Sequence, residues 1–418
     1  MRHYLIAALT STALVSPAFA ASPQEVAQTY VELAAAGYGD GLTTAQALQV
    51  AVDMFIAAPS EATHAAAKTA WLAARVPYMQ TEVYRFGNAV VDDWEGKVNA
   101  WPLDEGLIDY VDASYGQSEE NPLSTLNIVA NRSFTLSGAS IDATNLTPAF
   151  ISGTLHEVDG IEANVASGYH AIEFMLWGQD LNGTGPGAGA RSHTDYLQDS
   201  ACTNGNCNRR GAYLKAATDL LVTDLTYMAG QWAEGGEARA TIIADPNAAL
   251  SAMLTGMGSL SYGELAGQRM RLGVMLNDPE EEHDCFSDNT HNSHYYDGVG
   301  TQNVYLGSYT RVDGSVVSGP SLSALIALAD PAVDAQLKAE LDASVAALGA
   351  IKAKAESGMA YDQMLAAGNA EGEALIMGAV AALVTQTASI NRAVTAIGAS
   401  GVAIEGSDSL DNPGAVFQ

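Results

Sequence analysis

Long stretches with apolar residues at helical spacing dominate the sequence. They form four groups, at residues 23–86, 147–232, 246–276 and 321–397. Within each group apolar side chains recur every three or four positions, the spacing that places them on one face of an α-helix. No strict period relates the groups, which argues against a solenoid. The pattern therefore predicts an all-α fold of packed helical bundles.

The two halves of the chain share one plan, which predicts two domains. Each half combines long helices rich in Ala and Leu with one loop-rich, acidic excursion. We expect an N-terminal bundle at 21–235, which carries the motif described below, and a C-terminal bundle at 236–418. A length of 418 residues is enough for two or three such domains.

Four local patterns predict segments that are not helical. Residues 37–41 contain Gly at alternate positions and predict a turn between two helices. Residues 135–143 look like a linker of small residues. Residues 304–317 have partial strand character, which allows a short hairpin. The tail after Gly398 is rich in Gly, Ser and Asp and is expected to fray.

The charge balance restricts the partners of the protein. The chain has 48 acidic and 18 basic residues, a formal net charge of −30. This argues against nucleic acid, whose phosphates require Lys and Arg, and against an anionic membrane surface. No stretch after residue 20 looks long and apolar enough to span a bilayer. The composition suits a soluble protein whose acidic surface attracts cations.

Residues 1–20 predict export. They combine a basic start, an apolar core and an Ala-Phe-Ala ending, which is the pattern of a secretory signal peptide. The mature protein is therefore expected in the periplasm or associated with the envelope. In such a compartment Cys202 and Cys207 are expected to close a small disulfide loop, with a metal-binding pair as the alternative. Cys285 remains as a buried thiol or as part of the acidic segment around His283.

One His and one carboxylate interrupt the apolar run Gly168–Gly178. His170 and Glu173 are three positions apart, so on a helix they lie on one face, ~60° from each other. An unpaired buried charge is costly, and a bound cation is one way to compensate it. Helical bundles use a Glu and a His at this separation to bind metals, usually with the Glu first. The alternative is a hydrogen-bonded pair that forms part of the core.

Further candidate ligands lie in acid-rich segments elsewhere. The segment Glu280–His291 contains five acids and two His, and residues 92–112 form an excursion rich in Trp and acids. On an earlier helix, Glu82 is a candidate to point into the bundle. For each of these the alternative is a solvated or salt-bridged surface. Beyond His170 and Glu173, the candidate ligands are Glu82, Asp104, His283 and Asp288.

Four runs of sequence resemble one family. They are Trp101–Gly106, Gly168–Glu173, Glu264–Met270 and Glu282–His291. The second run matches the Gly-x-His-x-x-Glu motif of the imelysin-like proteins, and the other three are similar to the iron-regulated protein A branch of that family. The similarity covers nearly the whole chain after residue 20. It implies an exported bacterial protein of two helical-bundle domains that is linked to iron uptake.

The resemblance also implies a site. His170 and Glu173 would be metal ligands, and residues 283–291 would join them from the second half of the chain, between the two domains. Iron accepts imidazole and carboxylate ligands, and the chain lacks a Cys ligand set for a softer metal. We therefore expect the protein to bind iron, as an ion or a chelate, and to pass it to an envelope transport partner. Zinc or another divalent metal is the alternative.

Two other functions stay open at this point. The family has been classed with metallopeptidases, and Glu173 or Glu282 would then act as general base. However, the His-Glu-x-x-His pattern that begins at His156 ends in Gly160, so enzyme activity is not favoured. The third possibility is a non-catalytic module that binds a haem-like ligand or a surface partner. In that case His170 and Glu173 would be a structural pair.

Overall fold

The computed structural model describes residues 21–417 of the chain. The predicted signal peptide, residues 1–20, lies outside the described residues. Within the described part, helices are the main regular elements, and two antiparallel two-stranded sheets accompany them. The prediction of an all-α fold is confirmed.

The first half of the chain is built on three long helices. They are α1 (Pro23–Ala57), α2 (Glu61–Met79) and α7 (Cys207–Trp232). Helix α1 packs against both of the others. The shorter α-helices are α3 (Ala89–Asn99), α4 (Glu105–Ile108), α5 (Pro148–Phe150) and α6 (Gly168–Trp177). They are joined by the 3-10 helices η1 (Glu82–Tyr84), η3 (Val158–Gly160) and η4 (His193–Tyr196) and by the π-helix η2 (Ile151–Leu155).

The second half contains one continuous helical run and two long helices, α13 (Pro331–Glu356) and α15 (Ala370–Ile397), that pack against each other. The run consists of α9 (Pro246–Ser259), η5 (Leu260–Arg271) and α10 (Leu272–Leu276). The long helix α13 packs against both α15 and α11. The remaining helices and their bounds are α8 (Glu237–Ala244), η6 (Pro279–Glu281), α11 (Thr290–Leu306), α12 (Leu322–Ala329), α14 (Tyr361–Leu365), α16 (Asp408–Asp411) and η7 (Ala415–Phe417).

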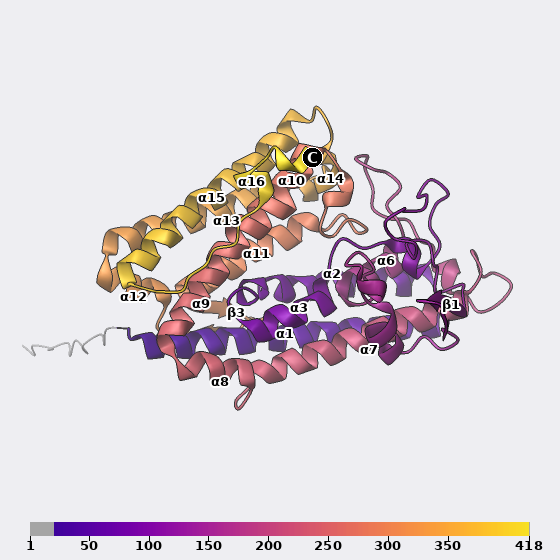
Figure 1. The fold of residues 1–418 in the computed structure, drawn as a ribbon, viewed down its shortest axis with the longest axis horizontal. Helices are drawn as coiled ribbons and strands as arrows, with labels where there is room; N and C mark the ends of the chain where they lie inside the picture. The colour runs from indigo at the N-terminus through magenta and orange to yellow at the C-terminus, as the bar shows by residue number, and fades with distance from the viewer. Residues whose placement is uncertain (1–20, 418) are drawn as a thin grey trace, which may run out of the picture.

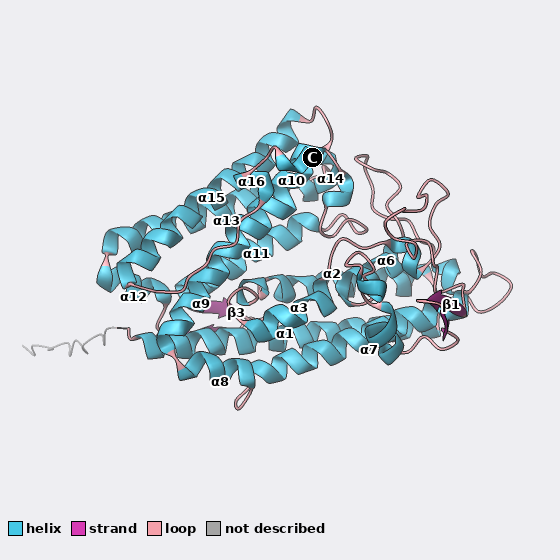
Figure 2. Cartoon of the chain, viewed as in Figure 1, coloured by secondary structure: helices cyan, strands magenta, loops and turns pink. Residues whose placement is uncertain are grey.

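The long helices lie in two layers (Figure 1). Helices α1, α2 and α7 form one layer, and α11, α13 and α15 form the other. Helix α2 contacts α11, and α1 contacts α9, which in turn packs against α15. These contacts join the two layers, so that one apolar core extends through residues of both halves. The long loops gather at one end of the molecule, around α6 (Figure 2). The division of the chain at residue 235 stays a prediction.

Helix α1 is a single helix, so the predicted turn at residues 37–41 is wrong. Ser22 and Glu25 form a capping box at its start. In its middle, a Cβ added at Gly37 would lie 2.9 Å from the Thr81 methyl group. This Gly therefore allows a neighbouring segment to approach the helix closely, and it does not end the helix.

Two hairpins accompany the helices. The strands β3 (Ser308–Thr310) and β4 (Val316–Ser318) pair antiparallel, which confirms the hairpin expected within residues 304–317. The strands β1 (Ser133–Leu136) and β2 (Ala139–Asp142) also pair, where a linker was predicted.

The tail after Gly398 does not fray, contrary to the prediction. The Ser251 hydroxyl donates to the carbonyl oxygen of Ser400 at 2.7 Å, and the backbone N–H of Glu405 donates to the Ser259 hydroxyl at 3.0 Å. The tail is therefore held along α9 by hydrogen bonds to its backbone, the groups that a frayed tail would leave to water.

One helix changes the membrane prediction. By length and composition alone, α15 is long and apolar enough to cross a bilayer, so the expectation that no stretch qualifies is wrong. However, 44% of its most apolar window is buried within the protein, against α13, η5 and α9. A core helix of a bundle passes the same test, so this is weak evidence for a membrane span.

The predicted disulfide between Cys202 and Cys207 is present. It closes a short loop directly before α7, so its loss should cost about 2 kcal/mol in the free energy of unfolding through chain entropy. We expect this loss in a Cys202→Ser/Cys207→Ser variant, measured by urea unfolding. Reduction of the unmodified protein should give the same value. A variant as stable as the oxidised chain would contradict the prediction.

Candidate metal centre

Helix α6 holds the central motif in the interior. All ten of its residues are buried. Its first residue, Gly168, has a φ of +82°, and a Cβ at this position would overlap the backbone of Val98. The preceding Ser167 donates its hydroxyl hydrogen to the Lys97 carbonyl oxygen at 2.9 Å. The start of α6 is thereby fixed against α3, two residues before His170.

His170 and Glu173 are in contact, as the spacing predicted. His170 Nδ1 lies 3.0 Å from Glu173 Oε2, and the two side chains are 1% and 0% exposed. The other carboxylate oxygen, Oε1, accepts from the backbone N–H of Ser287 at 2.9 Å and from its hydroxyl at 2.6 Å. Among the described residues, His170 Nε2 is buried without a hydrogen-bond partner.

The segment before α11 brings two further side chains to this pair. His170, His283 and Asp284 each offer a ligand atom, and these atoms lie within 4.8 Å of one another. The imidazole rings of the two His meet edge to face, with centroids 4.7 Å apart. The donors come from both halves of the chain, as expected. We call His170, Glu173, His283 and Asp284 the His170 centre.

Asp284 is the most constrained member of the centre. Its Oδ1 accepts from Arg75 Nη2 at 2.6 Å, and its Oδ2 accepts from Arg75 Nε at 3.2 Å. Asn289 and Ser293 also donate to Oδ2, at 2.8 and 2.5 Å. Because Arg75 is 1% exposed, this ion pair is fully desolvated and its geometry is fixed by several hydrogen bonds.

The donor set suits a metal ion. His170 Nδ1 faces Glu173, and His283 Nδ1 lies 3.2 Å from Asp284 Oδ1 and 3.2 Å from Arg75 Nη2. At His170, a carboxylate that accepts from Nδ1 leaves the lone pair on Nε2, which is how metal-binding imidazoles are commonly oriented. The unpartnered Nε2 of His170 fits this arrangement. His170, His283 and a carboxylate oxygen would hold the ion.

The electrostatics of the centre favour a cation. Burial, followed by the charge of Arg75, lowers the pKa of His170 to about 3. Burial also holds the pKa of His283 well below its ordinary value, so both imidazoles are neutral, as metal ligands must be. Burial, followed by the charge of Asp284, raises the pKa of Glu173 well above its ordinary value. Burial opposes ionisation of Asp284, but Arg75 keeps the pKa of this carboxyl far below its usual range.

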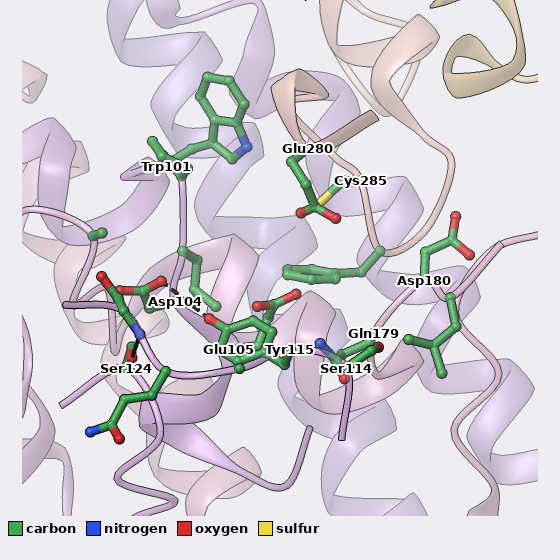
Figure 3. Close-up of a pocket in the computed structure, with 18 residues that line it drawn as sticks. Trp101, Asp104, Glu105, Ser114, Tyr115, Ser124, Gln179, Asp180, Glu280 and Cys285 are labelled. Carbon is green, nitrogen blue, oxygen red and sulfur yellow. Dashed lines mark hydrogen bonds between the residues drawn. The ribbon is translucent and has the colours of Figure 1, made fainter. Parts of the chain in front are cut away.

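Two open cavities lie near the buried centre, and one of them is lined by a residue of the centre. The larger has a volume of about 570 Å³, and Asp104 and Glu105 lie on its wall (Figure 3). The other, of about 510 Å³, is lined by His283 itself. Trp101 lines both cavities, and its ring centroid lies 5.8 Å from that of His283. Solvent space therefore reaches the centre at His283.

The structure places the other predicted ligands outside this group. Glu82 accepts from Arg269 Nη2 at 3.0 Å in a separate buried ion-pair cluster. Asp104 accepts from the Tyr115 hydroxyl at 3.1 Å. Asp288 lies on a different part of the acidic segment from His283 and Asp284. Its pKa is raised to about 7 by burial and then by the charge of Asp362.

Sequence reasoning missed two residues of the site. Asp284 directly follows His283 in the acidic segment, so its position was a usable signal. Arg75 is separated from Asp284 by more than two hundred positions, and nothing in its local sequence indicates that it enters the centre.

The fold and the buried imidazole–carboxylate group define an all-α protein with a candidate metal centre. The family model for imelysin matches residues 34–390, so the chain belongs to the imelysin family. No curated protein matches the chain.

Two solved structures share the fold. An iron-regulated protein A precursor from Parabacteroides distasonis ATCC 8503 is 22% identical, with a TM-score of 0.63, over 89% of this chain and 94% of that one. An imelysin-like protein from Psychrobacter arcticum 273-4 is 15% identical, with a TM-score of 0.54, over 90% of this chain and 96% of that one. At these identities the likeness shows the fold alone.

Proposed function

We propose that this protein is exported, binds iron at the His170 centre and serves iron uptake. Its place would be the periplasm or the envelope, where it would pass the metal to a transport partner. The protein from Parabacteroides distasonis is described as an iron-regulated precursor. That description supports both iron and export for this chain.

The charge of the centre carries the proposal. Glu173 and Asp284 are both buried, but among residues 21–417 only Asp284 forms an ion pair with a guanidinium, that of Arg75, and both imidazoles are neutral. A buried carboxylate without a compensating charge is costly. A cation bound beside Glu173 would supply the missing positive charge. Iron accepts imidazole and carboxylate ligands, and zinc is the alternative among common metals.

The same geometry favours binding over hydrolysis. A hydrolytic zinc site needs a carboxylate that is free to act as general base for a metal-bound water. Glu173 is the nearest candidate, but one of its oxygens faces His170 and the other accepts two hydrogen bonds from Ser287. The base role would require this carboxylate to leave its partners.

Elemental analysis of the purified chain tests the proposal. The protein is prepared without a polyhistidine tag and is exposed separately to iron, zinc, copper and calcium salts before desalting. We expect about one equivalent of iron to be retained. A His170→Ala/Glu173→Ala variant should lose it while its helical circular dichroism stays the same, because the variant lacks one imidazole ligand and the carboxylate that orients it, while α6 is held by its apolar residues.

A matched control carries the same kinds of substitution elsewhere. His193 and Glu119 lie outside the centre, so a His193→Ala/Glu119→Ala variant should retain iron as the unmodified protein does. Equal iron content in all three proteins would refute the His170 centre as the site. An unmodified protein that retains no metal would make His170 and Glu173 a structural pair.

A further inference from the structure

A second group of carboxylates lies close to the His170 centre but shares none of its residues. Glu282 precedes His283, Asp288 follows on the same segment, and Asp362 lies at the start of α14. Each of the three is within electrostatic range of at least one of the others, and Asp180 acts on all three. We call Glu282, Asp288 and Asp362 the Glu282 group.

Glu282 and Asp362 are buried, Asp288 is half-buried, and several of their carboxylate oxygens lack a side-chain partner. Glu282 is 0% exposed and Asp362 is 2% exposed. Glu282 Oε1 and Asp288 Oδ1 have no hydrogen-bond partner in residues 21–417, and the carboxylate of Asp362 has only the nearby backbone N–H groups of Asp362 and Gln363. Oε2 of Glu282 accepts from the Thr290 hydroxyl at 2.8 Å. Buried carboxylate oxygens are normally hydrogen-bonded or paired with a cation, so this concentration of exceptions requires an explanation.

No basic side chain supplies that explanation within the described part of the chain. None of the three carboxylates takes part in an ion pair there, and the charges acting on them are those of other acids. This distinguishes the group from Asp284, which pairs with Arg75. Burial raises the pKa of Asp362 to about 6 and that of Asp288 to about 7. Above neutral pH, several negative charges would therefore share one buried region.

Two residues of the group line a cavity of about 10 Å³. Glu282 and Asp362 both lie on the wall of one small cavity, together with Asp180 and Glu280. Figure 3 shows Asp180 and Glu280 on separate segments of the wall of the neighbouring, larger cavity, to which they also belong. The two cavities therefore share part of one acidic wall.

We propose that Glu282, Asp288 and Asp362 form a second cation site that binds calcium. Calcium takes six to eight oxygen ligands in a flexible geometry and does not need imidazole. These three side chains do not bring ligand atoms as close together as His170, His283 and Asp284 do. Hard cations keep water ligands, and bridging waters or a small shift of the segment would complete the coordination. The ion would connect the segment that carries His283 to α14.

Calorimetric titration tests the site directly. The full chain is stripped with a chelator and titrated with calcium chloride at pH 7.5, with magnesium chloride as a comparison. We expect saturable calcium binding and a higher melting temperature in calcium. Asp362→Asn and Glu282→Gln keep the side-chain shapes but remove a charge, so each should raise the calcium Kd at least about tenfold.

Two controls separate this site from general acidity and from the His170 centre. Glu119→Gln removes one charge from an exposed position and should leave the calcium Kd unchanged. His170→Ala should also leave calcium binding unchanged, although it should weaken iron binding. The proposal is overturned by an unmodified protein that binds no calcium, in which case the carboxyl groups are simply protonated. Equal calcium affinities of the Asp362→Asn, Glu282→Gln and Glu119→Gln proteins would overturn it as well.

Discussion

A Gly168→Ala variant is expected to lose about 3 to 5 kcal/mol in its free energy of unfolding, more than a typical single substitution. Two costs combine at this residue. Its φ of +82° lies in the left-handed region, which disfavours any side chain. The added methyl group would also overlap the carbonyl carbon and oxygen of Val98, which belong to the backbone of α3 and cannot rotate away.

The position of this Gly connects stability to the site. To accept a methyl group, α6 would have to move away from α3, and the helix carries His170 two residues later. We therefore expect the variant to lose iron binding under conditions where it is still folded. Chemical denaturation followed by circular dichroism measures the first effect, and elemental analysis at low denaturant measures the second.

Gly160 provides a matched control for the conformational part of this cost. It has a φ of +72°, but a Cβ at this position would have no heavy atom within 4 Å. Gly160→Ala should therefore cost only about 1 to 2 kcal/mol, the left-handed penalty alone, and should leave iron binding unchanged. If the two variants were equally destabilised, the contact with Val98 would not be the reason that the motif begins with Gly.

The difference between local sequence pattern and tertiary packing explains which parts of the fold were predictable. The helical spacing of apolar residues predicted α7, α13 and α15 well, because a buried stripe is a property of the local sequence. Gly37 was misinterpreted because a Gly that ends a helix and a Gly that admits a neighbouring segment look alike in sequence. Only the packed structure brings Thr81 to that position.

Helix α11 is a helix that the local sequence did not predict. Its sequence contains two Gly and several residues of low helix propensity, and it was not predicted as a helix. In the structure, Gly300 lies against the backbone of Gln80 and Gly298 against Leu348. Tertiary packing thus outweighs local propensity, and it also places the N-terminus of α11 where it orders the segment with His283.

The site was predictable to the extent that its residues were neighbours in sequence. The contact between His170 and Glu173 followed from helical spacing, and the acidic segment marked the region of His283. Glu82 was a reasonable candidate by the same logic, but its partner is Arg269, far away in the chain. Pairings between distant residues decide which buried acids are compensated, and one sequence does not reveal them.

Replacing Arg75 should have the other large effect. Arg75→Met would leave Asp284 buried at 0% exposure without its guanidinium partner, and such broken pairs typically cost 3 to 5 kcal/mol, or about 4 kcal/mol here. The loss would also remove hydrogen bonds to Asn99 and Ser293. Urea unfolding measures the effect. For comparison, Lys215→Met breaks an exposed pair with Asp53 and should change stability by less than about 1 kcal/mol.

A second substitution identifies the cause of the loss. In Arg75→Met/Asp284→Asn the uncompensated charge is gone, so the double variant should be more stable than the sum of the single losses by about 1 to 3 kcal/mol. Strictly additive losses would show that Arg75 stabilises the protein through packing on Tyr169 and Trp71 instead. The iron content of the single variant is informative as well. Without Arg75, Asp284 becomes a second uncompensated carboxylate beside Glu173, and a bound cation should then restore more stability than it gives the unmodified protein.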